Sequence, residues 1–165
     1  MENLNLYIEI VAVITGLIYL FLMINEKIAC WIFGIISSLL SIYLFVETKL
    51  YSEAILYTYY VVMGVYGWMY WSKKKEENKT VPVKRWAIQR HILLIILGVL
   101  LSFGLGSAFS NYTDAEAPFL DAFSTIFAFI ATYLEAQKVL EGWVYWILLN
   151  GFSVYLYSTR GLDIY

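Results

Sequence analysis

Six long apolar stretches, separated by short polar breaks, limit what this chain can fold into. Each has the roughly 17–25 residues that an α-helix needs to cross a bilayer core. Apolar residues make up 61% of the chain and charged residues 15%, whereas a soluble domain has roughly 25% charged residues. We therefore predict an all-α, polytopic membrane protein with six spans, at about 5–24, 28–46, 53–71, 91–109, 119–137 and 141–158.

Motifs of several other protein classes are missing from the sequence. The acidic start at Glu2 does not match a cleaved signal peptide, which begins with a basic region. Cys30 is the only cysteine, which excludes an internal disulfide and a thiolate metal cluster. No zinc-protease, serine-hydrolase or phosphate-binding glycine motif occurs. We predict a protein that is not an enzyme and has no cofactor and no metal site. The single histidine, His91, stands beside Arg90 at a predicted helix start and is interpreted as an interfacial residue.

The basic residues are concentrated in one segment. Seven of the eleven Lys and Arg lie between residues 72 and 90, and the positive-inside rule places such a loop in the cytoplasm. Nucleic-acid binding is not expected, because the run is short, is interrupted by Glu76 and Glu77, and lies between two spans. Counting spans outward from this loop places the N-terminus outside the cell.

Two parts of the chain repeat each other at an offset of 112 residues without a gap. Glu9 aligns with Asp121 in this register, so that an acid matches an acid. Similar sequence in two apolar halves is typical of a transporter built from two repeats, with its site where they meet. The identical pairs are Ile18/Ile130, Leu22/Leu134, Trp31/Trp143, Ile35/Ile147, Ser41/Ser153, Tyr43/Tyr155, Leu44/Leu156 and Leu50/Leu162.

The repeat predicts a 3+1+3 helix plan with two parallel three-helix repeats. The helix at 91–109 has no counterpart, and two parallel three-helix units need one extra crossing between them. Its Gly98, Gly104 and Gly106 suit close helix packing. The predicted organisation is a first repeat unit at 1–71, a cytoplasmic basic loop at 72–90, a connecting transmembrane helix at 91–109 and an incomplete second repeat unit at 119–165.

A seventh helix is expected after residue 165, because in the first unit the equivalent stretch leads into the helix at 53–71. Either the chain is truncated or another subunit completes the second half, and truncation is the preferred explanation. Without that helix one wall of the site would be absent, so weak or no ligand binding is expected unless a neighbouring subunit lends a helix.

Polar and aromatic residues share one face of the helix at 141–158. Trp143, Trp146, Asn150, Ser153 and Tyr157 recur at helical spacing. The matching face of the second helix carries Trp31, Gly34, Ser38, Ser41 and Phe45. An unpaired amide in hydrocarbon costs several kcal/mol, so Asn150 must face protein, water or a ligand. A hydrogen bond to a neighbouring helix is the alternative to a ligand contact.

Two further helices add candidates. On the helix at 119–137, Thr125 is expected to contact a ligand, whereas Asp121 and Glu135 lie ~21 Å apart along the axis and cannot form a catalytic pair. The helix at 53–71 combines Gly64 and Gly67, which allow close backbone approach, with an aromatic wall suited to a planar and especially a cationic solute. A tryptophan there could also serve in packing or in an interfacial belt. The candidate substrate-binding residues are Trp31, Ser38, Tyr57, Trp68, Thr125, Trp143, Trp146 and Asn150.

The chain resembles the PnuC family of bacterial B-vitamin transporters, which are similar in architecture to the SWEET sugar transporters. The resemblance covers the chain from its first predicted helix to its end. Its most specific segment runs from Lys138-x-x-Glu141 through Trp143-x-x-Trp146 to Asn150. Other matching segments are Leu50-Tyr51-x-x-Ala54, Tyr66-Gly67-Trp68-x-x-Trp71, Asp121-Ala122-x-x-Thr125 and Leu156-Tyr157-x-x-x-Gly161-Leu162.

The resemblance implies facilitated diffusion of a vitamin precursor through a multi-pass protein of the bacterial inner (plasma) membrane. The typical substrate is nicotinamide riboside, and other relatives carry thiamine, riboflavin or nucleosides, which are trapped inside by phosphorylation. Family sites lie between the two units, where aromatics stack the base and an Asn bonds the sugar. The matching positions are Trp143, Trp146 and Asn150.

One difference between this sequence and the family pattern keeps thiamine as a close second candidate substrate. Nicotinamide riboside carriers often have Gln in a Leu-Leu-Gln-x-x-Tyr segment, where this chain has Tyr57. The alternatives are a substrate-capture subunit of an ATP-driven vitamin importer, a SWEET-like sugar carrier and a membrane scaffold that binds no vitamin. The expected partners are the lipid bilayer and a small-molecule vitamin, with no nucleic acid, and a homo-oligomer is left open.

Overall fold

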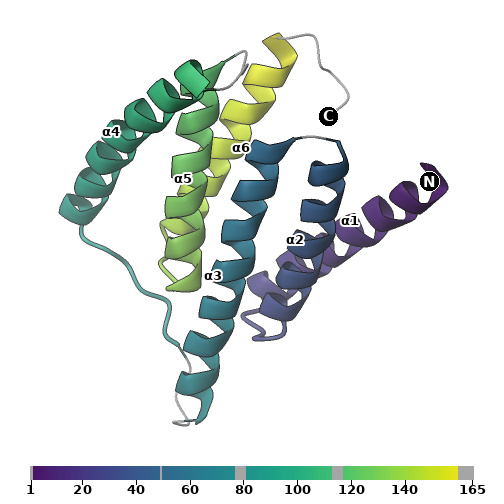
Figure 1. The fold of residues 1–165 in the computed structure, drawn as a ribbon. Coiled ribbons are helices and arrows are strands. Elements are labelled where there is room, and N and C mark those ends of the chain that lie inside the picture. The colour runs from purple at the N-terminus through teal and green to yellow at the C-terminus, as the bar shows by residue number, and fades with distance from the viewer. Residues whose placement is uncertain (1, 49, 77–80, 113–116, 160–165) are drawn as a thin grey trace. The chain divides into compact units, whose positions relative to one another are not determined.

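Every regular element is a helix in the computed structural model of the chain, which describes residues 2–48, 50–76, 81–112 and 117–159 (Figure 1). All six predicted helices are present in this part of the chain. They form two compact units, Met1–Pro82 and Val83–Tyr165. The helices are α1 (Glu2–Ile24), α2 (Cys30–Glu47), α3 (Tyr51–Glu76), α4 (Ile88–Tyr112), α5 (Pro118–Ala136) and α6 (Gly142–Thr159).

The predicted loop at 72–90 is wrong at both ends. Helix α3 continues past Trp71 to Glu76, and α4 already begins at Ile88. Lys and Glu have high helix propensity, so the charged run after Trp71 extends the helix instead of ending it. The described, non-helical part of this connection is therefore only residues 81–87.

In the first unit, α2 packs between α1 and α3 (Figure 1). The predicted close approach at the glycines of α3 is confirmed. A Cβ added at Gly67 would lie 2.5 Å from the Trp31 ring, and one at Gly64 would lie 2.6 Å from the Ile35 side chain. Only a residue without a side chain leaves room for the α2 side chains at these two levels.

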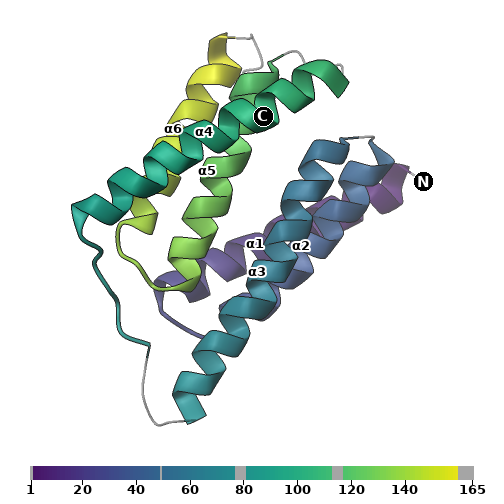
Figure 2. The same cartoon turned by 60° about the vertical axis from the view of Figure 1, so that its left-hand side comes forward.

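In the second unit, α5 packs between α4 and α6, and Figure 2 shows α4 crossing α5 obliquely. Small buried residues on α5, among them Ala122, Ala131 and Ala136, let its neighbours pack closely against it. Gly98 and Gly106 of α4 face Phe127 and Phe119 of α5, whereas Gly104 has no heavy atom within 4 Å of an added Cβ. The predicted packing role of α4 thus holds for two of its three glycines, and the helix packs on α5.

The turns before α2 and before α6 have the same backbone structure. Glu26 and Lys138, which the repeat register aligns, both adopt left-handed conformations, with φ of 55° and 53°. Lys27 N–H donates to the Leu22 carbonyl at 2.9 Å, and Val139 N–H donates to the Leu134 carbonyl at 2.8 Å. Each turn is a Schellman motif, which is a common way for a helix to end. The backbone therefore supports the alignment that the side chains suggested.

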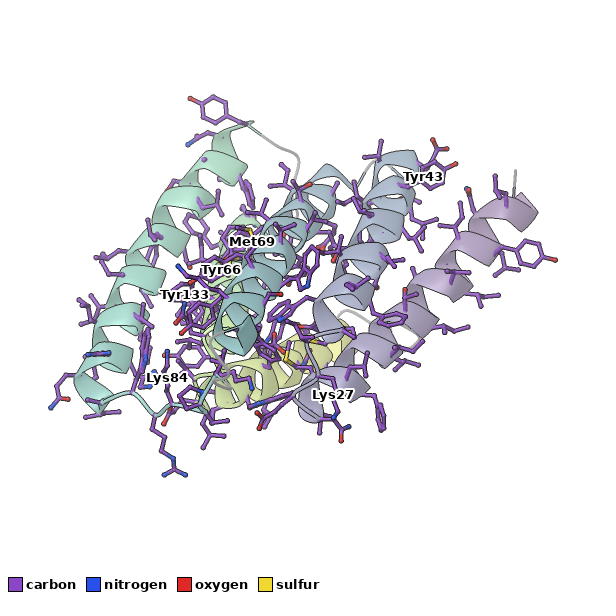
Figure 3. All side chains as sticks on the ribbon, turned by 90° about the horizontal axis from the view of Figure 1, so that it is seen from below. Lys27, Tyr43, Tyr66, Met69, Lys84 and Tyr133 are labelled. Carbon is purple, nitrogen blue, oxygen red and sulfur yellow. The ribbon has the colours of Figure 1, made fainter. Side chains whose placement is uncertain are left out.

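Much of the surface is apolar. Phe21 on α1 is 68% exposed and Ile147 on α6 is 69% exposed, a pattern that suits a lipid environment and not water. Figure 3 labels residues that project from the helices, including Tyr43 on α2 and Met69 on α3. By length and composition, α1, α2, α4 and α5 are apolar enough to cross a membrane. Helices α3 and α6 are long enough but richer in Tyr and Trp.

Candidate substrate-binding site

The predicted stripe on α6 is accessible within the second unit. Trp143 and Asn150 are exposed, and Trp146 and Ser153 are half-buried. Helix α6 begins at Gly142, so both tryptophans lie in its first two turns and Asn150 lies one turn further along. The side chain of Tyr157 lies outside the described residues. The stripe thus offers two indole rings and an amide along one edge of the helix.

Trp146 is held by the neighbouring helix. Its indole Nε1 donates a hydrogen bond to Oε2 of Glu135 on α5, at 3.3 Å. Phe123 and Phe152 pack together nearer the other end of the α5–α6 pair, with ring centroids 5.7 Å apart. The sequence analysis excluded Glu135 only from a catalytic pair with Asp121 and missed this contact, because a carboxylate and an indole eleven residues apart carry no local pattern that pairs them.

Thr125 lies on α5, where it is half-buried. Its hydroxyl donates to the Asp121 carbonyl one turn earlier, at 2.8 Å. A threonine oxygen that donates in this way can still accept a hydrogen bond from another group. A ligand contact at Thr125 stays a prediction.

In the first unit, Trp31 is part of the packed interior. It is 2% exposed, and its ring meets Trp71 edge-on at 5.4 Å between centroids. Its indole nitrogen has no hydrogen-bond partner among the described residues. Its repeat counterpart Trp143 is 36% exposed, so the paired tryptophans have different environments. Ser38, the other α2 candidate, is also buried.

The two candidates on α3 lie in different surroundings. Tyr57 belongs to an aromatic cluster, with ring centroids 5.0 Å from Phe45 and 5.1 Å from Tyr60. Trp68 is 45% exposed. Substrate contacts by Trp31, Ser38, Tyr57 and Trp68 stay predictions.

A polar cluster that the sequence analysis missed joins the start of α4 to the start of α6. His91 is 6% exposed, so its side chain is enclosed by protein, and its place at the membrane interface stays a prediction. Its Nδ1 shares a 3.2 Å hydrogen bond with the Tyr145 hydroxyl, and its Nε2 lies 3.8 Å from Oε2 of Glu141. The same Oε2 accepts the backbone N–H of Trp86 at 3.3 Å. We call these four residues, Trp86, His91, Glu141 and Tyr145, the α4–α6 cluster.

The segment before α4 lies along the α5–α6 turn. The Lys84 N–H donates to the Lys138 carbonyl at 2.8 Å, and the Leu140 N–H donates to the Lys84 carbonyl at 2.9 Å. These two bonds form an isolated parallel β-bridge between Lys84 and Val139. Figure 3 labels Lys84 on this segment and Tyr133 on α5. The Tyr133 ring meets Trp86, with centroids 6.5 Å apart. Within the described residues, no group of three or more His, Cys, Asp or Glu side chains could hold a metal ion.

Comparisons with known proteins agree on one family. The family described as "Nicotinamide mononucleotide transporter" matches residues 6–165. The nicotinamide riboside transporter PnuC of Escherichia coli (strain K12) is 25% identical over 181 residues, which cover 94% of this chain and 76% of that protein. The transporter of the same name from Neisseria mucosa is 26% identical, and the match covers 94% of this chain and 61% of that protein.

A solved structure shares the fold. The crystal structure of the vitamin B3 transporter PnuC matches with a TM-score of 0.75 at 23% sequence identity. The match covers 92% of this chain and 67% of that chain. The helical arrangement derived above is therefore that of a known membrane transporter.

Proposed function

This chain belongs to the nicotinamide mononucleotide transporter family, whose members are transporters and not enzymes, and on that premise we propose that it carries a vitamin riboside. The proposed substrate is nicotinamide riboside, with thiamine as the second candidate. It would cross the bacterial inner membrane by facilitated diffusion and be trapped inside by phosphorylation.

The α6 stripe is the observation that carries this proposal. Trp143 and Trp146 offer flat faces to an aromatic base, and Asn150 offers both a donor and an acceptor to sugar hydroxyls. The pyridinium ring of nicotinamide riboside is cationic, and a cation over an indole face gains roughly 0.5–2 kcal/mol. Glu135 accepts the hydrogen bond of Trp146 and so adds a negative charge next to the Trp146 indole. A positively charged aromatic solute suits this combination better than a neutral sugar does.

We also propose the 3+1+3 plan, with α1–α3 as the first repeat, α4 as the connecting helix, and α5 and α6 as the counterparts of α1 and α2. The matching Schellman turns at Glu26 and Lys138 support this correspondence. The basic segment between α3 and α4 would face the cytoplasm and the N-terminus the outside.

Uptake by purified protein in proteoliposomes tests the function. Labelled nicotinamide riboside should equilibrate across the membrane without ATP and without an ion gradient. Excess unlabelled nicotinamide riboside should compete, with thiamine competing more weakly and glucose not at all. Protein-free liposomes are the control for leakage.

The outcomes separate the alternatives. A capture subunit would bind the vitamin but would not equilibrate it without its ATPase. Competition by sugars alone would favour a SWEET-like carrier. Stronger competition by thiamine would make thiamine the substrate and would point to the aromatic Tyr57 cluster as the selective feature.

A further inference from the structure

A second segment of the chain runs along the turn that starts α6. Residues 84–86, which we call the strap, lie beside this turn as a short extended piece. Their first residue exchanges two backbone hydrogen bonds with the turn, 2.8 and 2.9 Å long. Their last residue, Trp86, donates its backbone N–H to Oε2 of Glu141 at 3.3 Å. The strap is thus bonded to the turn at both of its ends.

The turn before α2 has no such strap. No β-bridge occurs among the described residues of the first unit, and Ala29 stands where the second unit has Glu141. The first turns of the two helices nevertheless agree. Val144 N–H donates to the Glu141 carbonyl at 3.0 Å, and Ile32 N–H donates to the Ala29 carbonyl at 3.1 Å. The strap is therefore not needed to form the turn, and it has another role.

Glu141 connects the strap to α6 through both its backbone and its side chain. Its carbonyl accepts the N–H groups of Val144 and Tyr145, so it is the residue from which the helix starts. Its carboxylate accepts the N–H of Trp86, and a bond to a charged acceptor is stronger than one between neutral groups. Because one residue makes both sets of bonds, the strap fixes where α6 begins and how the helix is turned about its axis.

The strap holds α6 on the side opposite to the α6 stripe. With 3.6 residues per turn, Tyr145 follows Glu141 on one side of the helix, and Trp143 and Trp146 lie roughly half a turn around the axis. The Tyr145 hydroxyl shares a 3.2 Å hydrogen bond with His91 at the start of α4. Two successive turns of the strap side are therefore tied to other segments, while Trp143 on the other side is 36% exposed.

The ring of Trp86 fastens the strap to two further helices. It meets Tyr133 of α5, with centroids 6.5 Å apart, and His91 of α4, with centroids 6.2 Å apart. The guanidinium of Arg90 lies over the same ring, 5.5 Å from its centroid. The strap is thus fixed to α4 and α5 and gives the start of α6 a support that α6 does not provide for itself.

We propose that the strap positions the substrate site and that Glu141 is its positioning residue. By holding the back of α6, the strap keeps Trp143 and Asn150 turned in the direction in which they meet a ligand. A site that is held in place before binding loses less entropy when the ligand arrives. Trp146 is also held by Glu135, so the strap matters most for Trp143. The proposal rests on the proposed function, because the ligand it concerns is the vitamin riboside at the α6 stripe.

Two neighbouring proline substitutions test the strap. Lys84→Pro removes an N–H that donates to the turn, because proline has no N–H. Arg85→Pro is the matched control, since Arg85 is exposed and its N–H makes no hydrogen bond among the described residues. In isothermal titration with nicotinamide riboside, Kd should be about five- to tenfold weaker for Lys84→Pro and within about twofold of the wild type for Arg85→Pro. Lys84→Ala keeps the N–H, so its difference from Lys84→Pro measures the backbone effect.

Glu141→Ala and Glu141→Gln test the other end of the strap. Gln keeps an acceptor for the Trp86 N–H and Ala does not, so Kd should weaken about fivefold with Ala and recover with Gln. A merely structural role would lower the number of binding sites per protein and leave Kd unchanged, whereas loss of positioning weakens Kd at unchanged stoichiometry. Gly106→Ala is the control for destabilisation. Its Cβ would lie 2.5 Å from the Phe119 ring, so Tm should fall while Kd is unchanged.

Hydrogen exchange of the ligand-free protein tests the strap without any substrate. The amides of Lys84, Trp86 and Leu140 should exchange slowly in the wild type, and those of Trp86 and Leu140 should exchange faster in Lys84→Pro. Fast exchange at these amides in the wild type would overturn the strap.

The binding data decide whether the strap positions the site. Equal Kd values for Lys84→Pro and Arg85→Pro would overturn the positioning role, and this pair carries the test if Glu141→Ala does not fold. Absence of nicotinamide riboside binding by every protein, the wild type included, would contradict the proposed function and with it the positioning of this ligand. Hydrogen exchange would then still decide whether the strap forms.

Discussion

The indole N–H of Trp146 on α6 donates to the carboxylate of Glu135 on α5, with Nε1 and Oε2 3.3 Å apart. One of the two tryptophans proposed to stack the substrate is therefore oriented by a neighbouring helix. Trp143 has no such bond among the described contacts and is more exposed than Trp146. Trp146 is the more rigid of the two stacking surfaces, which lowers the entropy that binding must remove.

Glu135→Leu should weaken substrate binding by releasing the Trp146 ring. The hydrogen bond is charge-assisted and partly buried, so its loss should cost about 1–2 kcal/mol in affinity or stability. Glu135→Gln keeps an acceptor of the same length and is the matched control. Isothermal titration with nicotinamide riboside and thermal unfolding of both variants measure the effect. Equal losses for Leu and Gln would show that the charge matters and the hydrogen bond does not.

Asn150→Leu should abolish substrate binding and leave a folded, membrane-inserted protein. The amide is exposed on α6, so its removal leaves no gap in the interior of the second unit. Gly151→Ala is the matched control, because an added Cβ there meets no atom within 4 Å and lies off the stripe. Binding by titration and Tm by circular dichroism should separate the two variants. Unchanged vitamin affinity in Asn150→Leu would remove Asn150 from the site.

Gly67→Ala should destabilise the protein, because the new Cβ would lie 2.5 Å from the Trp31 ring. That ring is buried and has nowhere to move, and overpacking of this kind costs about 1–3 kcal/mol. Gly104→Ala, with nothing within 4 Å of the added Cβ, should be neutral or stabilising by up to about 1 kcal/mol. Thermal unfolding in one detergent compares the two variants. Equal stability would mean that Trp31 does not pack against Gly67.

The paired left-handed residues predict equal responses in the two turns. At Glu26 and at Lys138, with φ of 55° and 53°, Gly should give a more stable protein than Val. The left-handed conformation costs an L-residue about 1–2 kcal/mol, and a β-branched residue tolerates it least. The Gly-to-Val difference in unfolding free energy should agree between the two positions. A large difference at only one of them would argue against equivalent turns.

The orientation prediction rests on the basic residues between α3 and α4. A reporter that is active only in the cytoplasm should work when inserted between residues 77 and 80. The same reporter inserted between residues 113 and 116 should be inactive, since one more span separates the two positions. The reverse pattern would invert the proposed topology.

Much of the fold was predictable from local pattern. Runs of about 20 apolar residues predict helices whatever their neighbours are, and all six were found. The end of α3 was predicted less well. The apolar run stops at Trp71, but the good helix formers Lys73–Glu76 continue the helix to Glu76. The 112-residue register aligns Glu26 with Lys138, and the structure adds that both residues adopt the same left-handed turn conformation.

The burial of individual side chains and the partners they contact depend on segments that are distant in the sequence. Trp31 and Trp143 occupy equivalent positions in the repeat. Trp31 is nevertheless enclosed by Gly67 and Trp71 of α3, whereas Trp143 is 36% exposed. The position of His91 at a helix start can be read from the sequence, whereas its burial against Glu141 and Tyr145, about fifty residues away in the chain, cannot. Hydrophobic periodicity is a property of neighbouring residues and is therefore readable along the chain. The partner of a polar or aromatic side chain depends on which helices pack together, and only the tertiary structure decides that.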